Sequence, residues 1–139
     1  MISESQLTQG LKLATEVRLK AHAPYSKFKV GAAIKLKNKD QWVGGCNCEN
    51  SSYGGTVCAE RIAVFSSLSQ YGSTDFEALV LVTDTPTGDV PCAFCLQVLS
   101  EFVGPDFPVV CANLDGIKHR YTFKDLLPVT FDKANLPKK

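Results

Sequence analysis

The sequence lacks an excess of charge of either sign: 15 Lys and Arg residues stand against 14 Asp and Glu residues, a formal net charge of +1. A nearly neutral chain has no long-range field that would gather polyanions or bind a charged membrane surface. We therefore expect neither nucleic acid nor a membrane among its partners. Repeats, linkers and low-complexity tracts are missing too, so residues 1–139 are expected to form one domain, with a flexible tail over about 130–139.

A long apolar run is absent from the first stretch of the chain. Charged residues interrupt MISESQLTQGLKLATEVRLK throughout, which argues against a signal peptide or a membrane span there. We expect a cytoplasmic protein. Cysteines in such a chain are more naturally thiols or metal ligands than a disulfide framework. The six cysteines are Cys46, Cys48, Cys58, Cys92, Cys95 and Cys111.

Apolar residues at helical spacing predict helices in four stretches of the chain. The first opens with a capping box at Ser3 and Gln6 and ends before Pro24. The others cover about 56–71, with Thr56 as a possible cap, then 91–102 and 122–127, where Thr122 and Asp125 form a second box.

Period-two alternation predicts a strand at about 27–37, and a hairpin turn at 38–40 leads into a second strand at about 41–47. Further strands are predicted at 76–84, from a nearly continuous apolar run, and at 108–112. Lysines on one face of 27–37 and apolar residues on the other indicate a half-buried strand. The run FEALVLVTD at 76–84 is typical of a central strand buried on both faces. Alternating strands and helices favour an α/β fold, a three-layer α/β/α sandwich around one sheet.

Two short motifs carry the candidate chemistry: Cys-Ala-Glu-Arg at 58–61 and Pro-Cys-Ala-Phe-Cys at 91–95. Cys92 and Cys95 are three apart at a predicted helix start, so their sulfurs share one face where the helix dipole favours thiolates. With Cys58 as third ligand, a Zn²⁺ ion would keep its fourth tetrahedral position open for water. That open position distinguishes a catalytic zinc site from a structural one.

Two charged residues lie two and three positions after Cys58. Glu60 is near enough to take a proton from water and hand it on, which is a general acid/base role. Arg61 is a candidate to donate hydrogen bonds to the thiolates and offset their negative charge.

The two motifs together resemble the zinc-binding motifs of the cytidine deaminase family, and the similarity extends through 23–33 and 45–50 to 126–128. The resemblance implies a mixed, about five-stranded sheet and one Zn²⁺ per subunit. It also implies a hydrolase that converts cytidine and deoxycytidine to uridine and deoxyuridine with release of ammonia, in pyrimidine salvage.

The resemblance also assigns roles to individual residues. Glu60 would move protons between water, the ring nitrogen and the departing ammonia. Asn47 and Glu49 would hydrogen-bond the ribose hydroxyls, and Phe28 would lie against the pyrimidine. The backbone N–H of Ala59 could meet the base carbonyl.

A cysteine as first ligand and a short chain are similar to the homotetrameric branch of the family, in which Phe131 would reach a neighbour's active site. The second motif departs from the family pattern, because Ala93 replaces a glycine and Leu96 an arginine. The lost cation predicts weaker activation of water, which Leu96→Arg should reverse. Ala93 is tolerated if its φ is negative.

Simpler interpretations stay open at this point. Phe28 and Phe131 could be packing residues, and Asn47 and Glu49 ordinary turn and edge residues. We expect Cys46, Cys48 and Cys111 to be small buried apolar residues, and His22 and His119 to have no catalytic role.

Three other functions compete with the deamination of ordinary nucleosides. One is a deaminase of another aminopyrimidine, such as an antibiotic resembling blasticidin S. A second is a non-catalytic binding module stabilised by zinc. A third, a dithiol oxidoreductase using Cys92 and Cys95, leaves Cys58 and Glu60 unexplained.

Overall fold

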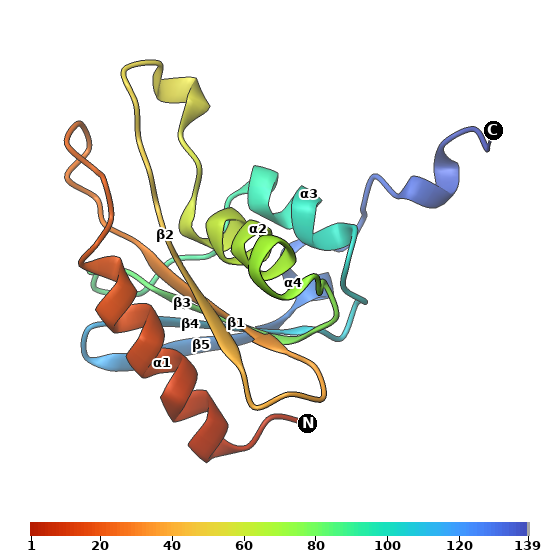
Figure 1. The fold of residues 1–139 in the computed structure, drawn as a ribbon, viewed down its shortest axis with the longest axis horizontal. Helices are drawn as coiled ribbons and strands as arrows, with labels where there is room; N and C mark the ends of the chain where they lie inside the picture. The colour runs from red at the N-terminus through yellow and green to blue at the C-terminus, as the bar shows by residue number, and fades with distance from the viewer. Residues whose placement is uncertain (139) are drawn as a thin grey trace.

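A five-stranded sheet with the strand order β2-β1-β3-β4-β5 forms the centre of the computed structural model, which describes residues 1–138 (Figure 1). Strands β3 and β4 are parallel, and the other neighbouring pairs are antiparallel. The predicted mixed sheet is therefore confirmed. The strands are β1 (Gly31–Leu36), β2 (Trp42–Cys46), β3 (Phe76–Val82), β4 (Pro108–Asn113) and β5 (Gly116–Thr122).

The helices begin close to the predicted positions. Both capping boxes are present, since the side chains of Ser3 and Thr122 each cap the first turn that follows. Thr56 is not the cap of the second helix: Cys58 takes that place with an extended backbone, and its carbonyl accepts the N–H of Ile62. The helices are α1 (Glu4–Arg18), α2 (Ala59–Tyr71), α3 (Ala93–Ser100) and α4 (Phe123–Leu126), with 3₁₀ turns η1 (Tyr53–Gly55) and η2 (Lys133–Asn135).

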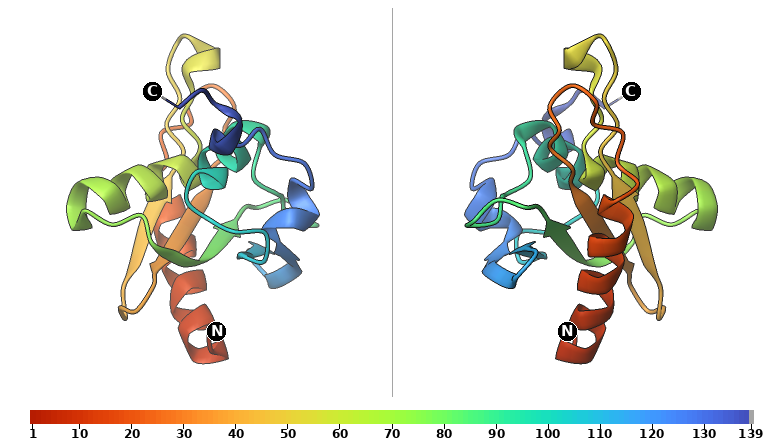
Figure 2. Two further views of the ribbon diagram at one scale, coloured as in Figure 1. Left: turned by 90° about the vertical axis from the view of Figure 1, so that its right-hand side faces the viewer. Right: turned by 90° about the vertical axis from the view of Figure 1, so that its left-hand side faces the viewer.

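Separate apolar clusters cover the two faces of the sheet. On one face, Leu7 and Ala14 of α1 pack against Ala33, Trp42 and their neighbours. On the other face, α2 and α3 bury their apolar sides against the remaining sheet residues. Figures 1 and 2 show α1 on one side of the sheet and α2 and α3 on the opposite side, so the three-layer α/β/α sandwich is confirmed. Within residues 1–138, no helix has the length and apolar character needed to cross a bilayer.

The prediction of a half-buried strand over 27–37 is wrong. Strand β1 begins only at Gly31, and Lys27, with a φ of 61° in the left-handed region, is not in an extended conformation. All six residues of β1 are buried, since helices cover both faces of the sheet. Lys35 is only 2% exposed, and its ammonium lies 2.9 Å from Glu77 Oε2, so its charge is paired rather than solvated.

The C-terminal tail extends away from the sheet in Figure 1, with η2 near its end. Residues 128–138 are largely exposed. Flexibility of the tail stays a prediction, and Lys139, its last residue, lies outside the described residues.

Gly45 lets α2 approach β2 closely. A Cβ atom at this position would lie 2.3 Å from the carbonyl oxygen of Ala59 and 2.4 Å from the amide nitrogen of Ala63. Both are backbone atoms of α2, so the start of that helix would have to move.

We expect Gly45→Ala to lower the free energy of unfolding by about 1–3 kcal/mol, measured by urea denaturation. Gly54→Ala is the matched control because nothing lies within 4 Å of its Cβ position; equal midpoints for the two variants would contradict the prediction.

Candidate metal centre and substrate pocket

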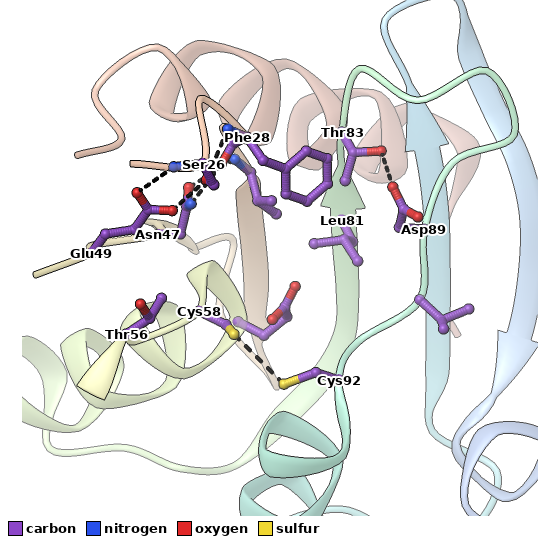
Figure 3. A pocket seen from close by; sticks show the side chains of 13 residues that line it. Ser26, Phe28, Asn47, Glu49, Thr56, Cys58, Leu81, Thr83, Asp89 and Cys92 are labelled. Atoms are coloured by element: carbon purple, nitrogen blue, oxygen red, sulfur yellow. Dashed lines mark hydrogen bonds between the residues drawn. The ribbon is translucent and has the colours of Figure 1, made fainter. Parts of the chain in front are cut away.

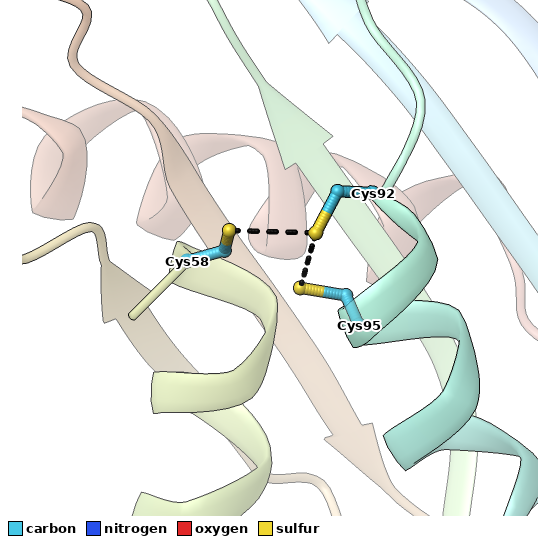
Figure 4. Close-up of side chains that lie close together, drawn as sticks. All are labelled: Cys58, Cys92 and Cys95. Atoms are coloured by element: carbon cyan, nitrogen blue, oxygen red, sulfur yellow. Dashed lines mark hydrogen bonds between the residues drawn. The ribbon is translucent and has the colours of Figure 1, made fainter. Parts of the chain in front are cut away.

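Three cysteine sulfurs converge where α2 and α3 begin. Cys58 caps α2, Cys92 caps α3, and Cys95 lies in the first turn of α3. Cys92 Sγ lies 3.6 Å from both Cys58 Sγ and Cys95 Sγ (Figure 4). A tetrahedral zinc site with Zn–S bonds of about 2.3 Å places its sulfurs about 3.8 Å apart. The three sulfurs therefore fit one zinc ion, as the spacing of the two motifs predicts.

The environment of the sulfurs favours ionisation of Cys58, whereas the hydrogen bond with Cys58 and burial raise the pKa of Cys95. Hydrogen bonds from Cys95, Arg61 and Cys92, the first being the strongest influence, lower the pKa of Cys58 to about 5. The N-terminal ends of two helices add partial positive charge. A thiol that ionises below neutral pH is ready to bind a metal, since the thiolate is the ligand form.

The metal-binding cluster within residues 1–138 consists of the three cysteines and has no fourth protein ligand. Zinc bound there would retain a coordination position for a small oxygen ligand. A structural zinc site normally has four protein ligands, so this donor set is typical of a catalytic site.

Glu60 lies directly beside the sulfurs without belonging to that cluster. Its side chain is 4% exposed, and its Oε2 accepts a hydrogen bond of 2.9 Å from Cys95 Sγ. Desolvation raises the pKa of this carboxyl group to about 7. A carboxyl group with such a pKa can both accept and donate a proton near neutrality, which is what general acid/base catalysis requires.

Arg61 is placed to offset negative charge on the sulfurs. Its Nη2 lies 3.5 Å from Cys58 Sγ and donates a second hydrogen bond, of 3.2 Å, to the carbonyl of Thr56. Leu96, which stands where the family motif has an arginine, is 7% exposed and packs in the apolar cluster beneath α2 and α3. Arg61 is therefore the cationic side chain that donates to these sulfurs within residues 1–138.

Ala93 fits its position. It is the first residue of α3, and the non-glycine residues with positive φ in residues 1–138 are Lys27 and Asn38. Its φ is therefore negative, so the glycine of the family motif is not needed for backbone conformation here.

A cavity of about 290 Å³ opens above the sulfurs (Figure 3). Cys58, Cys92 and Glu60 line one part of it, and Phe28, Asn47 and Glu49 line another. The structure thus brings together these predicted site residues. Two others do not line the cavity: Ala59 is fully buried, and Phe131 lies in the tail with an exposed fraction of 67%.

Asn47 is engaged with the segment that carries Phe28. Its Oδ1 accepts the N–H of Val30 at 2.8 Å, and its Nδ2 donates to the carbonyl of Phe28 at 2.7 Å. The amide therefore fixes the backbone on both sides of the Phe28 side chain. The sequence predicts either a ribose contact or an ordinary turn position for Asn47, and these two backbone contacts were not predicted.

Glu49 is held by the loop before Phe28. Its Oε1 accepts the N–H groups of Tyr25 and Ser26, each at 3.1 Å, and its Oε2 accepts the Ser26 hydroxyl. These hydrogen bonds, that of the Ser26 side chain first, lower the pKa of Glu49 and keep it ionised. The sequence analysis gave Ser26 no role, although it lies inside the stretch that resembles the family.

The cavity wall opposite Glu49 was also missed. Asp89 Oδ2 accepts the hydroxyls of Thr83 and Thr85, each at 2.8 Å, and Asp89 and Thr83 line the cavity (Figure 3). These residues lie in the loop between β3 and α3, where no periodic pattern marks a side chain as facing a cavity.

The expectation for the remaining cysteines is partly wrong. Cys111 is buried in β4, but Cys46 is only half-buried and Cys48 is exposed. The strand pattern that predicted burial ends at Cys46, and Cys48 lies beyond it in an isolated bridge to His22 and Val57.

Comparisons with known proteins agree with this geometry. The chain matches the family described as the cytidine and deoxycytidylate deaminase zinc-binding region over residues 4–112. It is 44% identical over 121 residues to a cytidine deaminase of Sporosarcina psychrophila, covering 87% of this chain and 88% of that protein. A blasticidin-S deaminase of Bacillus cereus is 28% identical over 116 residues, 78% of this chain and 80% of that protein.

A solved structure supports the fold as well as the sequence match. The crystal structure of cytidine deaminase from Burkholderia pseudomallei superposes with a TM-score of 0.84 at 39% identity, covering 94% of this chain and all of that chain. Similarity at this level covers nearly the whole chain and shows that the two proteins share their fold.

Ser26→Ala tests how Glu49 is kept ionised. Loss of the hydroxyl should raise the pKa of Glu49 toward the ordinary carboxyl value, measured by an NMR titration of its side chain. A carboxyl group whose pKa is lower in the folded than in the unfolded protein stabilises the fold at pH values above its pKa in the unfolded chain. That contribution is lost as the pH falls through its pKa in the folded protein. As the pH is lowered, the Ser26→Ala variant should therefore begin to lose stability at a higher pH than the parent protein. Ser51→Ala, an exposed serine nearby, is the control; an unchanged Glu49 titration in Ser26→Ala would refute the assignment.

Proposed function

Since the chain belongs to the cytidine and deoxycytidylate deaminase family, we propose that it is a zinc-dependent hydrolase of cytidine and deoxycytidine. The reaction adds water and releases ammonia, leaving uridine or deoxyuridine. The observation that carries this proposal is a three-sulfur cluster without a fourth protein ligand in residues 1–138, beside the buried carboxyl group of Glu60 at one end of a cavity.

Zinc held by Cys58, Cys92 and Cys95 would supply Lewis acidity, which makes water a better nucleophile at neutral pH. Glu60 receives the proton of the attacking water and delivers it to the ring nitrogen beside the amino-bearing carbon. It then takes the remaining proton of the added hydroxyl group and passes it to the leaving amino group, so that ammonia departs and a carbonyl group remains. The pKa of about 7 suits a group that must be base and acid in one cycle.

Other residues of the cavity orient the nucleoside. The ring of Phe28 would provide a face for the pyrimidine, and Asn47 and Glu49, which line the same cavity, would hydrogen-bond the ribose hydroxyls. The N–H of Ala59 lies in the first turn of α2, where helix N–H groups lack an intrahelical acceptor, and it is assigned to the base carbonyl. Ionised Glu49 accepts hydrogen bonds only, which suits hydroxyl donors.

We further propose that the enzyme is a single domain that acts as a homotetramer in the cytoplasm, in pyrimidine salvage, without nucleic acid or membrane partners. The exposed side chain of Phe131, outside its own subunit's cavity, supports a role in a neighbouring site. Three cysteine ligands need a reducing compartment, because oxidation to disulfides would remove them.

A deaminase of a blasticidin S-like antibiotic is the alternative within enzymes, favoured by the 28% identical relative. A panel of cytidine, deoxycytidine and blasticidin S, followed by ultraviolet absorbance, separates the two. Strong preference for the antibiotic would replace the proposed substrate. Zinc-loaded protein that is inert towards the whole panel would instead support a non-catalytic binding module.

Glu60→Gln tests the proton-transfer role. We expect deamination to fall by at least about 100-fold while zinc content and thermal stability stay near the parent values, because the amide keeps the shape but not the proton chemistry. The assay is cytidine turnover with zinc measured by atomic absorption. Glu16→Gln, an exposed glutamate on α1, is the control. Undiminished turnover by Glu60→Gln would remove the mechanism.

Mixed assemblies test whether Phe131 completes a neighbour's site. If it does, Glu60→Gln and Phe131→Ala subunits that are inactive or impaired alone will regain turnover when coexpressed, since some sites then combine an intact Glu60 with an intact Phe131. Activity no higher than the average of the two separate variants would contradict the shared site.

A further inference from the structure

The aromatic ring of Phe94 in α3 lies close to the guanidinium group of Arg61 in α2. Phe94 lies between Cys92 and Cys95, and its ring centroid is 5.6 Å from Arg61 Cζ. That distance is within the range of a cation–π contact. Phe94 is 72% exposed, so it contributes little to the apolar core, and it does not line the cavity.

The polar contacts of Arg61 leave its orientation weakly determined. Nη2 makes both hydrogen bonds of the side chain, to Cys58 Sγ and to the Thr56 carbonyl, and the first is long at 3.5 Å. Nε is buried and has no hydrogen-bond partner in the described part of the chain. The ring of Phe94 thus supplies an attraction that hydrogen bonds alone do not provide.

The charge at the metal centre makes this orientation important. Three thiolates exceed the charge of one Zn²⁺ ion by one unit, and a nearby cation reduces that excess. Leu96 is apolar and buried, so it gives no second cation, and the balance depends on how closely Arg61 is held to Cys58.

We propose that Phe94 is a positioning residue that holds the Arg61 guanidinium against the Cys58 sulfur through a cation–π contact, and so slows zinc release and sustains turnover. The inference rests on the zinc site of the proposed function but not on the identity of the substrate. Phe94 lies inside the second cysteine motif but has neither a metal-binding nor a catalytic role in the proposed function.

The test measures zinc release from the loaded protein into excess chromophoric chelator. We expect Phe94→Leu to release zinc about two- to fivefold faster, while Phe94→Tyr and Phe94→Trp, which keep an aromatic face, release it near the parent rate. In Phe94→Leu, kcat for cytidine should fall while KM stays unchanged, because Phe94 is not part of the cavity.

A double-mutant cycle shows whether Phe94 acts through Arg61. In an Arg61→Gln background, Phe94→Leu should have no further effect on zinc release. Tyr71→Leu, an exposed aromatic at the far end of α2, is the matched control and should release zinc at the parent rate. Thermal melts show that each variant is folded.

Three results would overturn the inference. They are parent-like zinc release by Phe94→Leu, an equal effect of Phe94→Leu in both backgrounds, and failure of Phe94→Tyr and Phe94→Trp to restore slow release. A parent protein that binds no zinc would overturn the proposed function and this inference together.

Discussion

The meeting of two helix N-termini over one end of the sheet is the constraint on which the site depends. Helix α2 follows β2 and α3 follows β3, and their first turns place three sulfurs within 4.8 Å of one another. Close packing maintains that meeting, since the backbone of α2 approaches Gly45 too closely for any side chain there. The sheet therefore determines the metal geometry, although no strand residue is a ligand.

Burial and hydrogen bonding shift the pKa values of one carboxyl group and one thiol in opposite directions within the same small volume. Glu60 is desolvated and holds its proton up to about neutral pH, whereas Cys58 ionises readily because hydrogen bonds stabilise its thiolate. Glu49, at the other side of the cavity, stays ionised for the same reason as Cys58. Desolvation of Glu60 and the hydrogen bonds to Cys58 and Glu49 thus give neighbouring acidic groups different tendencies to ionise.

Local patterns in the sequence were sufficient to predict the Cys92–Cys95 pair, the capping boxes and the three layers, whereas the addition of Cys58 needed two motifs 34 residues apart and their resemblance to a known family. The cysteine spacing fixes a helical face, and a capping box is complete within four residues. Predictions that needed knowledge of tertiary neighbours were wrong or absent. The alternating pattern predicts that Lys35 faces solvent, whereas its side chain is buried and paired with Glu77. The contacts of Asn47 and Phe94 join segments that are distant in the chain.

The hydrogen bonds of Asn47 and Glu49 to the protein itself mean that these polar groups have fixed positions before any ligand arrives. The entropy cost of ordering these groups is therefore met during folding, whereas a flexible binding loop would incur that cost each time it bound a ligand. On the proposed assignment of these two residues to the ribose, affinity for the sugar is tied thermodynamically to the stability of the loop over 23–30. A mutation that loosens this loop would weaken binding even where every atom able to touch the ligand is retained.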